Sequence, residues 1–251
     1  MIRVGTAAWG LPRAVAGRFG AGGSNLVRYA TRFDAVEINT TFYRPHRRAT
    51  FERWADSVPD GFRFAAKLPR TITHEARLVD CDAALAGFLE GVRGLRDRLG
   101  PLLVQLPPSL GFDEAVAKPF FAGFRALHPG PIACEPRHPT WFGLDAEALL
   151  KAFTVARVAA DPPPIPAAAF PGGWPGLRYH RLHGAPRIYW SAYTPGTLDT
   201  LADTLCAGAA DAETWCILDN TAAGAATADA LAVTERLRGR AGFGIRRGVP
   251  T

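Results

Sequence analysis

The chain has 251 residues, 48% of them hydrophobic, which is enough to bury one large β/α core. No apolar run approaches the roughly 20 residues needed to cross a bilayer, and the opening MIRVGTAAWG lacks the pattern of a secretory signal, so we expect a cytoplasmic protein without a membrane partner. The net charge of +6 would suit a phosphate-rich partner, but the basic residues are scattered and mostly arginine, which compositional bias explains equally well.

Short apolar segments alternate along the chain with longer segments of helical spacing. The predicted strands are, in chain order, Ile2–Thr6, Ala35–Asn39, Phe62–Leu68, Leu102–Leu106, Ile132–Glu135, Val155–Asp161, Tyr179–Gly184 and Trp215–Asn220. The predicted helices include Asp82–Leu99, Val116–Leu127, Ala146–Phe153 and Ala228–Arg240. Strand–helix repeats of this number and length predict an α/β protein, a closed (β/α)8 TIM barrel that forms a single domain over residues 1–251.

An open doubly wound sheet is the competing arrangement. Its first strand normally leads into a G-x-G-x-x-G turn that holds a phosphate. Here the first strand leads into GTAAWG, which does not match that pattern. The barrel is therefore the expected fold.

Most of the predicted strands end in polar residues. In a barrel, the carboxyl ends of all strands converge on one mouth. Glu37, Lys67 and Arg181 lie within otherwise apolar segments, where an unpaired charge would cost several kcal/mol. We therefore expect these charges to meet at the mouth, either as a ligand site or as a structural ion-pair network.

Several segments resemble, in the same order, the signature segments of the YecE-like family, which is also called domain of unknown function 72. They are VEINTTFYRP at 36–45, FRFAAKLPRTITHEARL at 62–78, LLVQLPPS at 102–109, EPRHPTWF at 135–142, YHRLHG at 179–184 and LDNTAAGAATADA at 218–230. The resemblance implies a TIM barrel and a soluble bacterial or archaeal protein, but it implies no reaction. The chain departs from the family pattern in its first loop, GTAAWGL, and at Asp219 and Asp229, where the family carries amides.

The candidate catalytic residues are Glu37, Lys67, Glu135 and His183. A carboxylate in a partly apolar mouth can have a raised pKa, so Glu37 and Glu135 could act as general acid and base. Each could instead only neutralise a neighbouring cation. Lys67 could form a Schiff base if its pKa were depressed, although an ion pair or an anion contact is the plainer role.

Basic side chains at the strand ends indicate an anionic group in the ligand, because the planar forks of Arg137 and Arg181 suit carboxylate or phosphate. Aromatic rings in the same loops could stack on a base or a sugar, or they could simply pack over the mouth. The predicted ligand-binding residues are Trp9, Asn39, Tyr43, His74, Gln105, Arg137, His138, Trp141, Arg181, Tyr189, Asp219 and Asn220.

A divalent metal stays open as a cofactor, because His74, His138 and His183 could hold one together with the carboxylates of the mouth. Against a metal, neither H-x-H nor H-E-x-x-H occurs, and the interleaved lysine and arginines would repel a cation. The four cysteines also form no C-x-x-C pair. No metal ligand is therefore assigned.

These residues favour an enzyme that uses acid/base chemistry on a small anionic ligand, such as a phosphorylated sugar or a nucleotide. A hydrolase, an isomerase or a lyase would fit. One alternative is a protein that processes nucleic acid, with or without a metal. Another is a barrel that binds a ligand without turning it over. The sequence indicates neither the substrate nor the oligomeric state.

Overall fold

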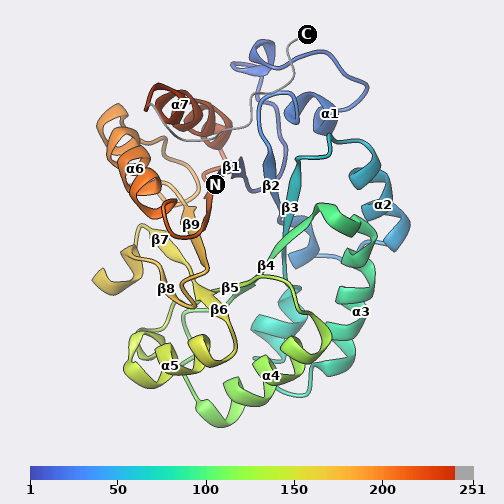
Figure 1. Ribbon diagram of the computed structural model, residues 1–251, viewed down its shortest axis with the longest axis vertical. Coiled ribbons are helices and arrows are strands. Elements are labelled where there is room, and N and C mark those ends of the chain that lie inside the picture. The colour runs from blue at the N-terminus through green and yellow to red at the C-terminus, as the bar shows by residue number, and fades with distance from the viewer. Residues whose placement is uncertain (241–251) are drawn as a thin grey trace.

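Strands and helices alternate along the chain as predicted, with the strands at the centre of the molecule and the helices around them (Figure 1). The computed structural model describes residues 1–240. The strands of that range are β1 (Ile2–Thr6), β2 (Ala35–Ile38), β3 (Arg63–Lys67), β4 (Leu99–Gln105), β5 (Ile132–Glu135), β6 (Val155–Arg157), β7 (Ala159–Asp161), β8 (Gly172–Gly173), β9 (Leu177–Leu182) and β10 (Glu213–Leu218). Its α-helices are α1 (Asn25–Tyr29), α2 (Arg48–Asp56), α3 (Asp82–Val92), α4 (Glu114–Leu127), α5 (Leu144–Ala152), α6 (Pro195–Gly208) and α7 (Ala225–Gly239).

The strands of residues 1–240 form two sheets, ordered β1-β10-β9-β7 and β2-β3-β4-β5-β6-β8. Their strand pairs are parallel, apart from the antiparallel pairing of β8 with β6. A single bridge, between Ala7 and Glu37, links the end of β1 to β2. Neighbouring strands thus follow chain order, as in a barrel, without forming one continuous hydrogen-bonded ring in this range.

The predicted sixth strand, Val155–Asp161, is divided between the two sheets. Its first part, β6, pairs with β5, and its second part, β7, pairs with β9. Only Val158 separates the two parts, so the chain itself passes from one sheet to the other. The structure is therefore a mixed α/β fold with two largely parallel sheets. A closed TIM barrel, as expected from the sequence, is not shown in the described residues.

The observed helices agree with the predicted ones apart from one break. The predicted helix Asp82–Leu99 ends as an α-helix at Val92 and continues as tighter helical turns over Arg93–Arg98. Within those turns Arg96 has a φ of 54°, in the left-handed region that interrupts regular helical hydrogen bonding. The chain then enters β4 at Leu99, so this break sets where the fourth strand begins.

Alternation along the strands divides the buried apolar residues into two clusters, because successive side chains point to opposite faces. The larger cluster packs between strands and helices and includes Val36 and Ile38 of β2. The smaller cluster fills the inner face: Ala7, Ala35, Ala65, Leu103, Ala133, Ala156, Val158, Leu177, Tyr179, Trp215 and Ile217. Small residues make room for large ones there, since a Cβ on Gly100 would lie 2.7 Å from the Trp215 ring. The interior is therefore packed with side chains.

Gly5 of β1 provides a test of this packing, because a Cβ at that position would overlap the backbone carbonyl of Ala35. We expect Gly5→Ala to lower the free energy of unfolding by about 1–3 kcal/mol, the usual range for overpacking. The matched control is Gly87→Ala in α3, where a Cβ meets no atom within 4 Å. That change should raise stability by about 0.5–1 kcal/mol. Urea unfolding measures both, and equal stabilities for the two variants would contradict the close approach at Gly5.

Candidate functional site

Polar side chains form a layer at the carboxyl ends of the strands, directly beyond the small inner cluster. The alternation of side chains along a strand produces this layer, because each of its residues follows an inner-face residue by two positions. They are Glu37, Lys67, Gln105, Glu135, Arg181 and Asp219. All six are buried. The sequence-predicted ring of charges is thus brought together on one face of the strands.

Arg181 on β9 is the centre of this layer. Its Nε and Nη2 donate to the two carboxylate oxygens of Glu37, at 3.1 and 2.7 Å. Its Nη1 donates to Glu135 Oε2 at 2.6 Å, and its Nη2 also donates to Asp219 Oδ2 at 3.0 Å. One guanidinium, itself 0% exposed, thereby ties together carboxylates from β2, from β5 and from the end of β10.

His183, just after β9, is held between two carboxylates. Its Nε2 lies 2.9 Å from Glu135 Oε1, and its Nδ1 lies 3.0 Å from Asp219 Oδ2. Arg137 adds a second donor to Glu135 Oε1 through Nη2 at 2.8 Å. Gln105 donates to Glu135 Oε2 at 3.0 Å. The imidazole is therefore fixed at both nitrogens.

Tyr179 belongs to the same site, although sequence reasoning missed it. Its hydroxyl donates to Glu37 Oε2 at 2.9 Å, and its ring is fully buried. It lies two residues before Arg181 on β9, so the period of two could have identified it as an inner-face residue. We refer to Glu37, Gln105, Glu135, Arg137, Tyr179, Arg181, His183 and Asp219 as the charge network.

Mutual attraction outweighs burial in the pKa values of Arg181, Glu135 and Asp219. Burial alone would lower the pKa of Arg181, but Glu37, Glu135 and Asp219 raise that pKa well above its usual value. Burial alone would raise the pKa of Glu135, but Arg181 and His183 lower it well below the usual range. The pKa of Asp219 is lowered in the same way, against burial, by Arg181 and His183. A raised pKa, expected for a carboxylic general acid, is therefore not found at Glu135.

The imidazole of His183 is stabilised in its charged form. Burial would lower its pKa, but the charge of Glu135 and the hydrogen bonds to Asp219 and Glu135 raise the pKa above its usual value. Both ring nitrogens face carboxylate oxygens, and Nε2 also lies 3.1 Å from Nη2 of Arg137, which can only donate.

Lys67 of β3 lies beside the charge network without joining it. Its side chain is 5% exposed, and within residues 1–240 its ammonium forms no salt bridge with any carboxylate. The nitrogen lies 3.9 Å from the centroid of the Phe42 ring. Burial, and then the charge of Arg181, lower the pKa of Lys67 to about 8 against the opposing carboxylates. Lys67 can therefore gain and lose its proton near neutral pH.

Residues predicted to bind ligand surround Lys67 and His183 at different depths. The His74 ring packs edge-on against Phe42, 4.9 Å between centroids, and burial followed by the charge of Lys67 lowers its pKa. Tyr43 is 69% exposed, and its ring lies edge-on to Phe42, 5.0 Å between centroids. Tyr189 is 40% exposed and lies edge-on to His183 at 5.7 Å.

The loop that carries Tyr189 folds back tightly over the end of β9. Tyr189 has a φ of 70°, and its backbone N–H donates to the carbonyl of His183 at 2.5 Å. A left-handed tyrosine costs about 1–3 kcal/mol, and such strain persists where the surrounding contacts fix it. The loop thus holds an exposed phenol ring over a buried imidazole.

Two amides at the strand ends keep an oxygen without a partner. Asn39, after β2, and Asn220, after β10, each have a buried Oδ1 that accepts no hydrogen bond within the described residues. The other end of the Asn220 amide is occupied, since Nδ2 donates to Asp229 Oδ2 at 2.7 Å and to Ser191 O at 2.9 Å. Such atoms are costly to bury unless a partner satisfies them.

Three predicted ligand residues are not brought to the charge network. Trp9 packs edge-on against Trp54 of α2, 5.0 Å between centroids. His138 instead accepts from the backbone N–H of Thr140 and so caps the short helical turn Pro139–Phe142. Trp141 is 1% exposed, and its indole donates to the Leu110 carbonyl at 3.0 Å.

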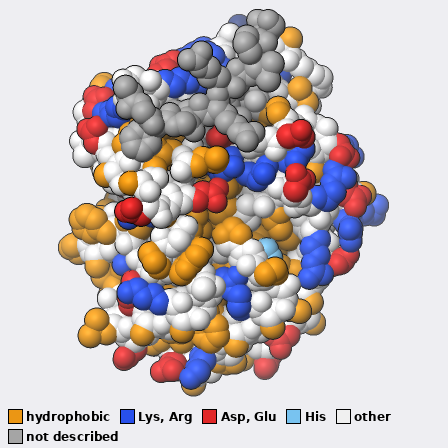
Figure 2. Space-filling view, in the orientation of Figure 1, with side chains coloured by type: hydrophobic (Ala, Val, Ile, Leu, Met, Phe, Trp, Pro, Cys, Tyr) orange, Lys and Arg blue, Asp and Glu red, His pale blue; other side chains and the backbone are white. Residues whose placement is uncertain are grey.

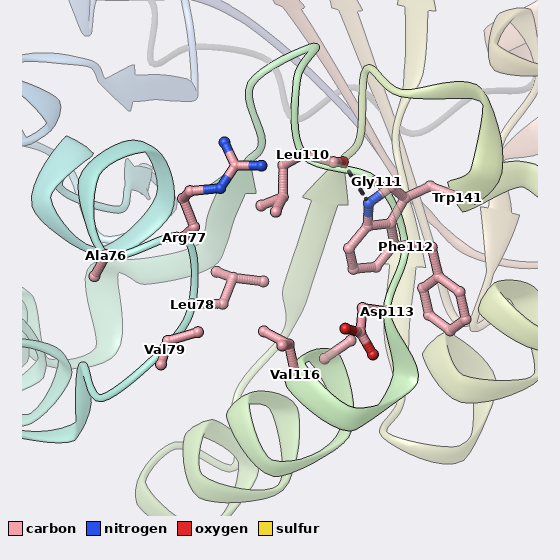
Figure 3. A pocket seen from close by; sticks show the side chains of 11 residues that line it. Ala76, Arg77, Leu78, Val79, Leu110, Gly111, Phe112, Asp113, Val116 and Trp141 are labelled. Carbon is pink, nitrogen blue, oxygen red and sulfur yellow. Dashed lines mark hydrogen bonds between the residues drawn. The ribbon is translucent and has the colours of Figure 1, made fainter.

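Trp141 lines a separate pocket of about 460 Å³ between the loops that follow β3, β4 and β5. Figure 3 shows its ring facing Leu110 and Val116, with the Arg77 side chain on the opposite side. Arg77 donates to the Ser109 carbonyl at 2.9 Å and thereby ties two of these loops together. The lining is mostly apolar and includes no member of the charge network.

Two further features concern possible ligands and membranes. Within residues 1–240, no group of three or more His, Cys, Asp or Glu is arranged to hold a metal ion. None of the helices in that range combines the length and the apolar character needed to cross a membrane. On the face in Figure 2, basic and acidic side chains are interspersed, which gives no support for a nucleic-acid surface on that face.

The family model described as "Protein of unknown function DUF72" matches residues 3–249. The chain belongs to the DUF72 family. It is 35% identical over 175 residues to the UPF0759 protein YecE of Escherichia coli (strain K12), an alignment that covers 67% of this chain and 62% of that relative. The homologue of Escherichia coli O157:H7 is 36% identical over 149 residues, or 59% of this chain and 52% of its own length. The chain thus spans less than two thirds of the relatives it matches.

Solved DUF72 structures share the fold. A protein from Enterococcus faecalis V583 superposes with a TM-score of 0.80 at 22% identity, covering 95% of this chain and 96% of its own. One from Thermotoga maritima MSB8 superposes with a TM-score of 0.78 at 23% identity, covering 95% and 99%. At these identities the likeness establishes the fold alone, so the chemistry of the DUF72 site must be argued from its residues.

Removing Arg181 should destabilise the protein strongly, because it would leave three buried carboxylates without their shared partner. We expect Arg181→Met to lower the free energy of unfolding by about 3–5 kcal/mol. The control is Arg48→Met, which removes a solvent-exposed arginine paired with Glu52 and Glu90 and should change stability little. Chemical denaturation compares the two, and similar losses in both variants would show that the network contributes no more than a surface pair.

The contacts of His183 with Glu135 and Asp219 should make the stability of the protein depend on pH in a defined direction. Its pKa is raised on folding, so its stabilising contribution is complete below about pH 6.5 and is lost as the pH rises through the folded-state pKa. The difference in unfolding free energy between wild type and His183→Gln should therefore shrink as the pH rises. Urea titrations at a series of pH values test this, and a difference that grows with pH would contradict it.

Proposed function

We propose that this DUF72 protein is an enzyme that binds a small anionic ligand at the carboxyl ends of its strands and acts on it by acid/base chemistry. One observation carries the proposal. Lys67, Arg137, Arg181 and the raised-pKa His183 gather around only three carboxylates, and Lys67 forms no salt bridge within residues 1–240. A ligand carboxylate or phosphate would balance the excess cationic charge.

The geometry supports a division of roles between the cations. Arg181 is saturated by its carboxylates and positions the site rather than binding ligand. Arg137 is 21% exposed and uses only Nη2 in its salt bridge, so its other N–H groups can face an anion. Lys67 contributes a point charge at the end of β3. Tyr189 supplies a ring that can lie over the ligand.

Proton transfer is best assigned to Lys67, whose pKa is lowered by burial, and to His183, whose pKa is raised against burial by Glu135 and by its hydrogen bonds. The pKa of Lys67 is about 8, and that of His183 is raised above its usual value. A general acid or base works best when its pKa is close to the working pH. Glu135, whose pKa is held low by Arg181 and His183 against burial, serves to orient and charge the imidazole.

Two further expectations join this proposal. We infer that the two sheets act together as a barrel-like wall, supported by the Ala7–Glu37 bridge and by the direct passage from β6 to β7 through Val158. We also propose a cytoplasmic location, in keeping with free cysteines at 81, 134, 206 and 216.

Inorganic phosphate is the simplest probe of the anion site. Isothermal titration should show binding at pH 7 that weakens at least about tenfold in Lys67→Met, the loss expected for one charge-assisted hydrogen bond. Lys118→Met, which removes an exposed lysine of α4, is the control and should bind as wild type does. Affinity should also fall as the pH rises past about 8, because Lys67 then loses its proton.

Phosphate affinity that is the same in wild type and in Lys67→Met would contradict an anion site at this lysine. Once a turned-over ligand is found among phosphorylated sugars or nucleotides, His183→Gln should reduce kcat more than it changes KM. Full activity in that variant would remove His183 from the proposed chemistry.

A further inference from the structure

The chain contains only three lysines among 29 basic residues, the other 26 being arginines. Lys118 and Lys151 lie on the exposed faces of α4 and α5, each paired with a glutamate one helical turn away at 3.6 Å. Lys67 is the one buried lysine, and it is placed at the carboxyl end of a strand. In a protein whose usual cation is arginine, this position requires a separate explanation.

Lysine and arginine differ most in what the nitrogen can do when it loses a proton. An arginine stays charged in proteins and presents no free amine. A buried lysine can become a neutral amine, and a neutral amine is a nucleophile toward carbonyl carbon. An anion contact alone would be served as well by arginine, with its additional donors.

The surroundings of Lys67 favour an amine that has no ion-pair partner and is held in place. One side of the nitrogen faces the Phe42 ring, and no carboxylate of residues 1–240 forms a salt bridge that would fix the proton. Burial, followed by the charge of Arg181, lowers the pKa of Lys67 to about 8. Among the described residues, the Lys67 nitrogen is not one of the fully buried side-chain atoms that lack a hydrogen-bond partner. This is in keeping with access to the nitrogen from the strand ends.

The backbone at Lys67 is fixed by the neighbouring strand connection. Thr41 Oγ1, in the turn after β2, donates to the carbonyl of Lys67 at 2.7 Å and to that of Ile38 at 2.8 Å. Lys67 therefore projects from a strand end whose position is set by hydrogen bonds. A group held in this way loses little freedom when it reacts.

We propose that Lys67 forms an imine with the carbonyl carbon of a small aldehyde or ketone that also carries a carboxylate or a phosphate. This inference deepens the proposed function and rests on it, because the anionic group of the substrate would occupy the site at Arg137. The substrate class is therefore small anionic carbonyl compounds, which include sugar phosphates in their open-chain form.

The step is balanced without any further reactant. The neutral Lys67 amine adds to the carbonyl carbon, and the carbonyl oxygen takes up a proton to give a carbinolamine. The nitrogen then expels that hydroxyl, which leaves as water with a second proton, and a carbon–nitrogen double bond forms. His183 is the group of this site suited to supply the proton that the carbonyl oxygen takes up. The nitrogen loses one proton as the carbinolamine forms and a second as the neutral imine forms, and these two replace the two protons that leave with the oxygen as water.

Borohydride trapping tests the proposal on the intact protein, because the hydride reduces an imine to a stable secondary amine. The protein is incubated at pH 7 with pyruvate, with dihydroxyacetone phosphate or with acetone, each with and without sodium borohydride. Peptide mass spectrometry then gives the modified fraction at each of the three lysines. Lys118 and Lys151 serve as exposed references within the same molecule.

We expect a borohydride-dependent adduct at Lys67 with at least one of the two anions, at least about tenfold above the exposed lysines. The reason is that a lysine with a pKa near 8 has on the order of 100 times more free amine at pH 7 than an ordinary lysine. Pyruvate and dihydroxyacetone phosphate distinguish a carboxylate from a phosphate substrate. Lys67→Arg, which keeps the charge, should lose the adduct.

Modification of Lys67 no higher than that of Lys118 and Lys151, with both anions, would overturn the proposal. If acetone labelled Lys67 as strongly as pyruvate or dihydroxyacetone phosphate does, the proposed requirement for an anionic group in the substrate would be overturned. The wild-type comparison needs no variant, so it holds even where Lys67→Arg folds poorly. Lys67-dependent phosphate binding without any imine would leave the proposed function standing and remove this inference alone.

Discussion

The pairing of Arg181 with three buried carboxylates is the interaction on which the rest of the site depends. Removing four charges from water is costly, and it is repaid only where the geometry is good and the remaining hydrogen-bonding positions are filled. Here the arginine fork meets both oxygens of Glu37 and one oxygen each of Glu135 and Asp219. Because these groups come from different strands, the network also fixes how the strand ends lie relative to one another. Glu135, once placed, orients His183 and Arg137 through its second oxygen.

Much of this layer could be predicted from the sequence, because a strand has a period of two. Polar residues at the last inward position of an apolar segment, such as Glu37, Lys67 and Arg181, are expected to meet at the strand ends, where they can pair with one another or with a ligand. The division of Val155–Asp161 between two sheets could not be predicted, because that segment looks like one apolar strand and its break is set by which neighbours each half meets. The contacts of loop residues could not be predicted either. Trp141 and His138 follow a strand, but they form hydrogen bonds with Leu110 and Thr140 rather than with the charge network.

The charge states of the site depend on distances that a sequence does not contain. A carboxylate in an apolar segment can have its pKa raised by burial or lowered by a cation, and the two outcomes need the same residue types. In Glu135 the cations prevail, since Arg181, His183 and Arg137 all lie against it. In Lys67 burial prevails, because no carboxylate approaches closely enough to form a salt bridge within residues 1–240. The same layer therefore holds a carboxylate whose pKa is lowered below its usual range and an amine whose pKa is lowered to about 8.

That contrast explains why a structural ion-pair network is not the whole account of these residues. A network selected for stability alone would pair each buried charge, as Arg181 does, or replace it with an apolar residue, which is often at least as stable. Lys67 follows neither course, and Asn39 and Asn220 beside the same strand ends each keep an amide oxygen without a partner in the described residues. Tyr189 adds a strained backbone on the loop above His183. Unpaired charge, unsatisfied amides and strain each reduce stability. Their presence around one saturated arginine supports the proposal that the charge network is a rigid support for the groups that bind and act on the ligand.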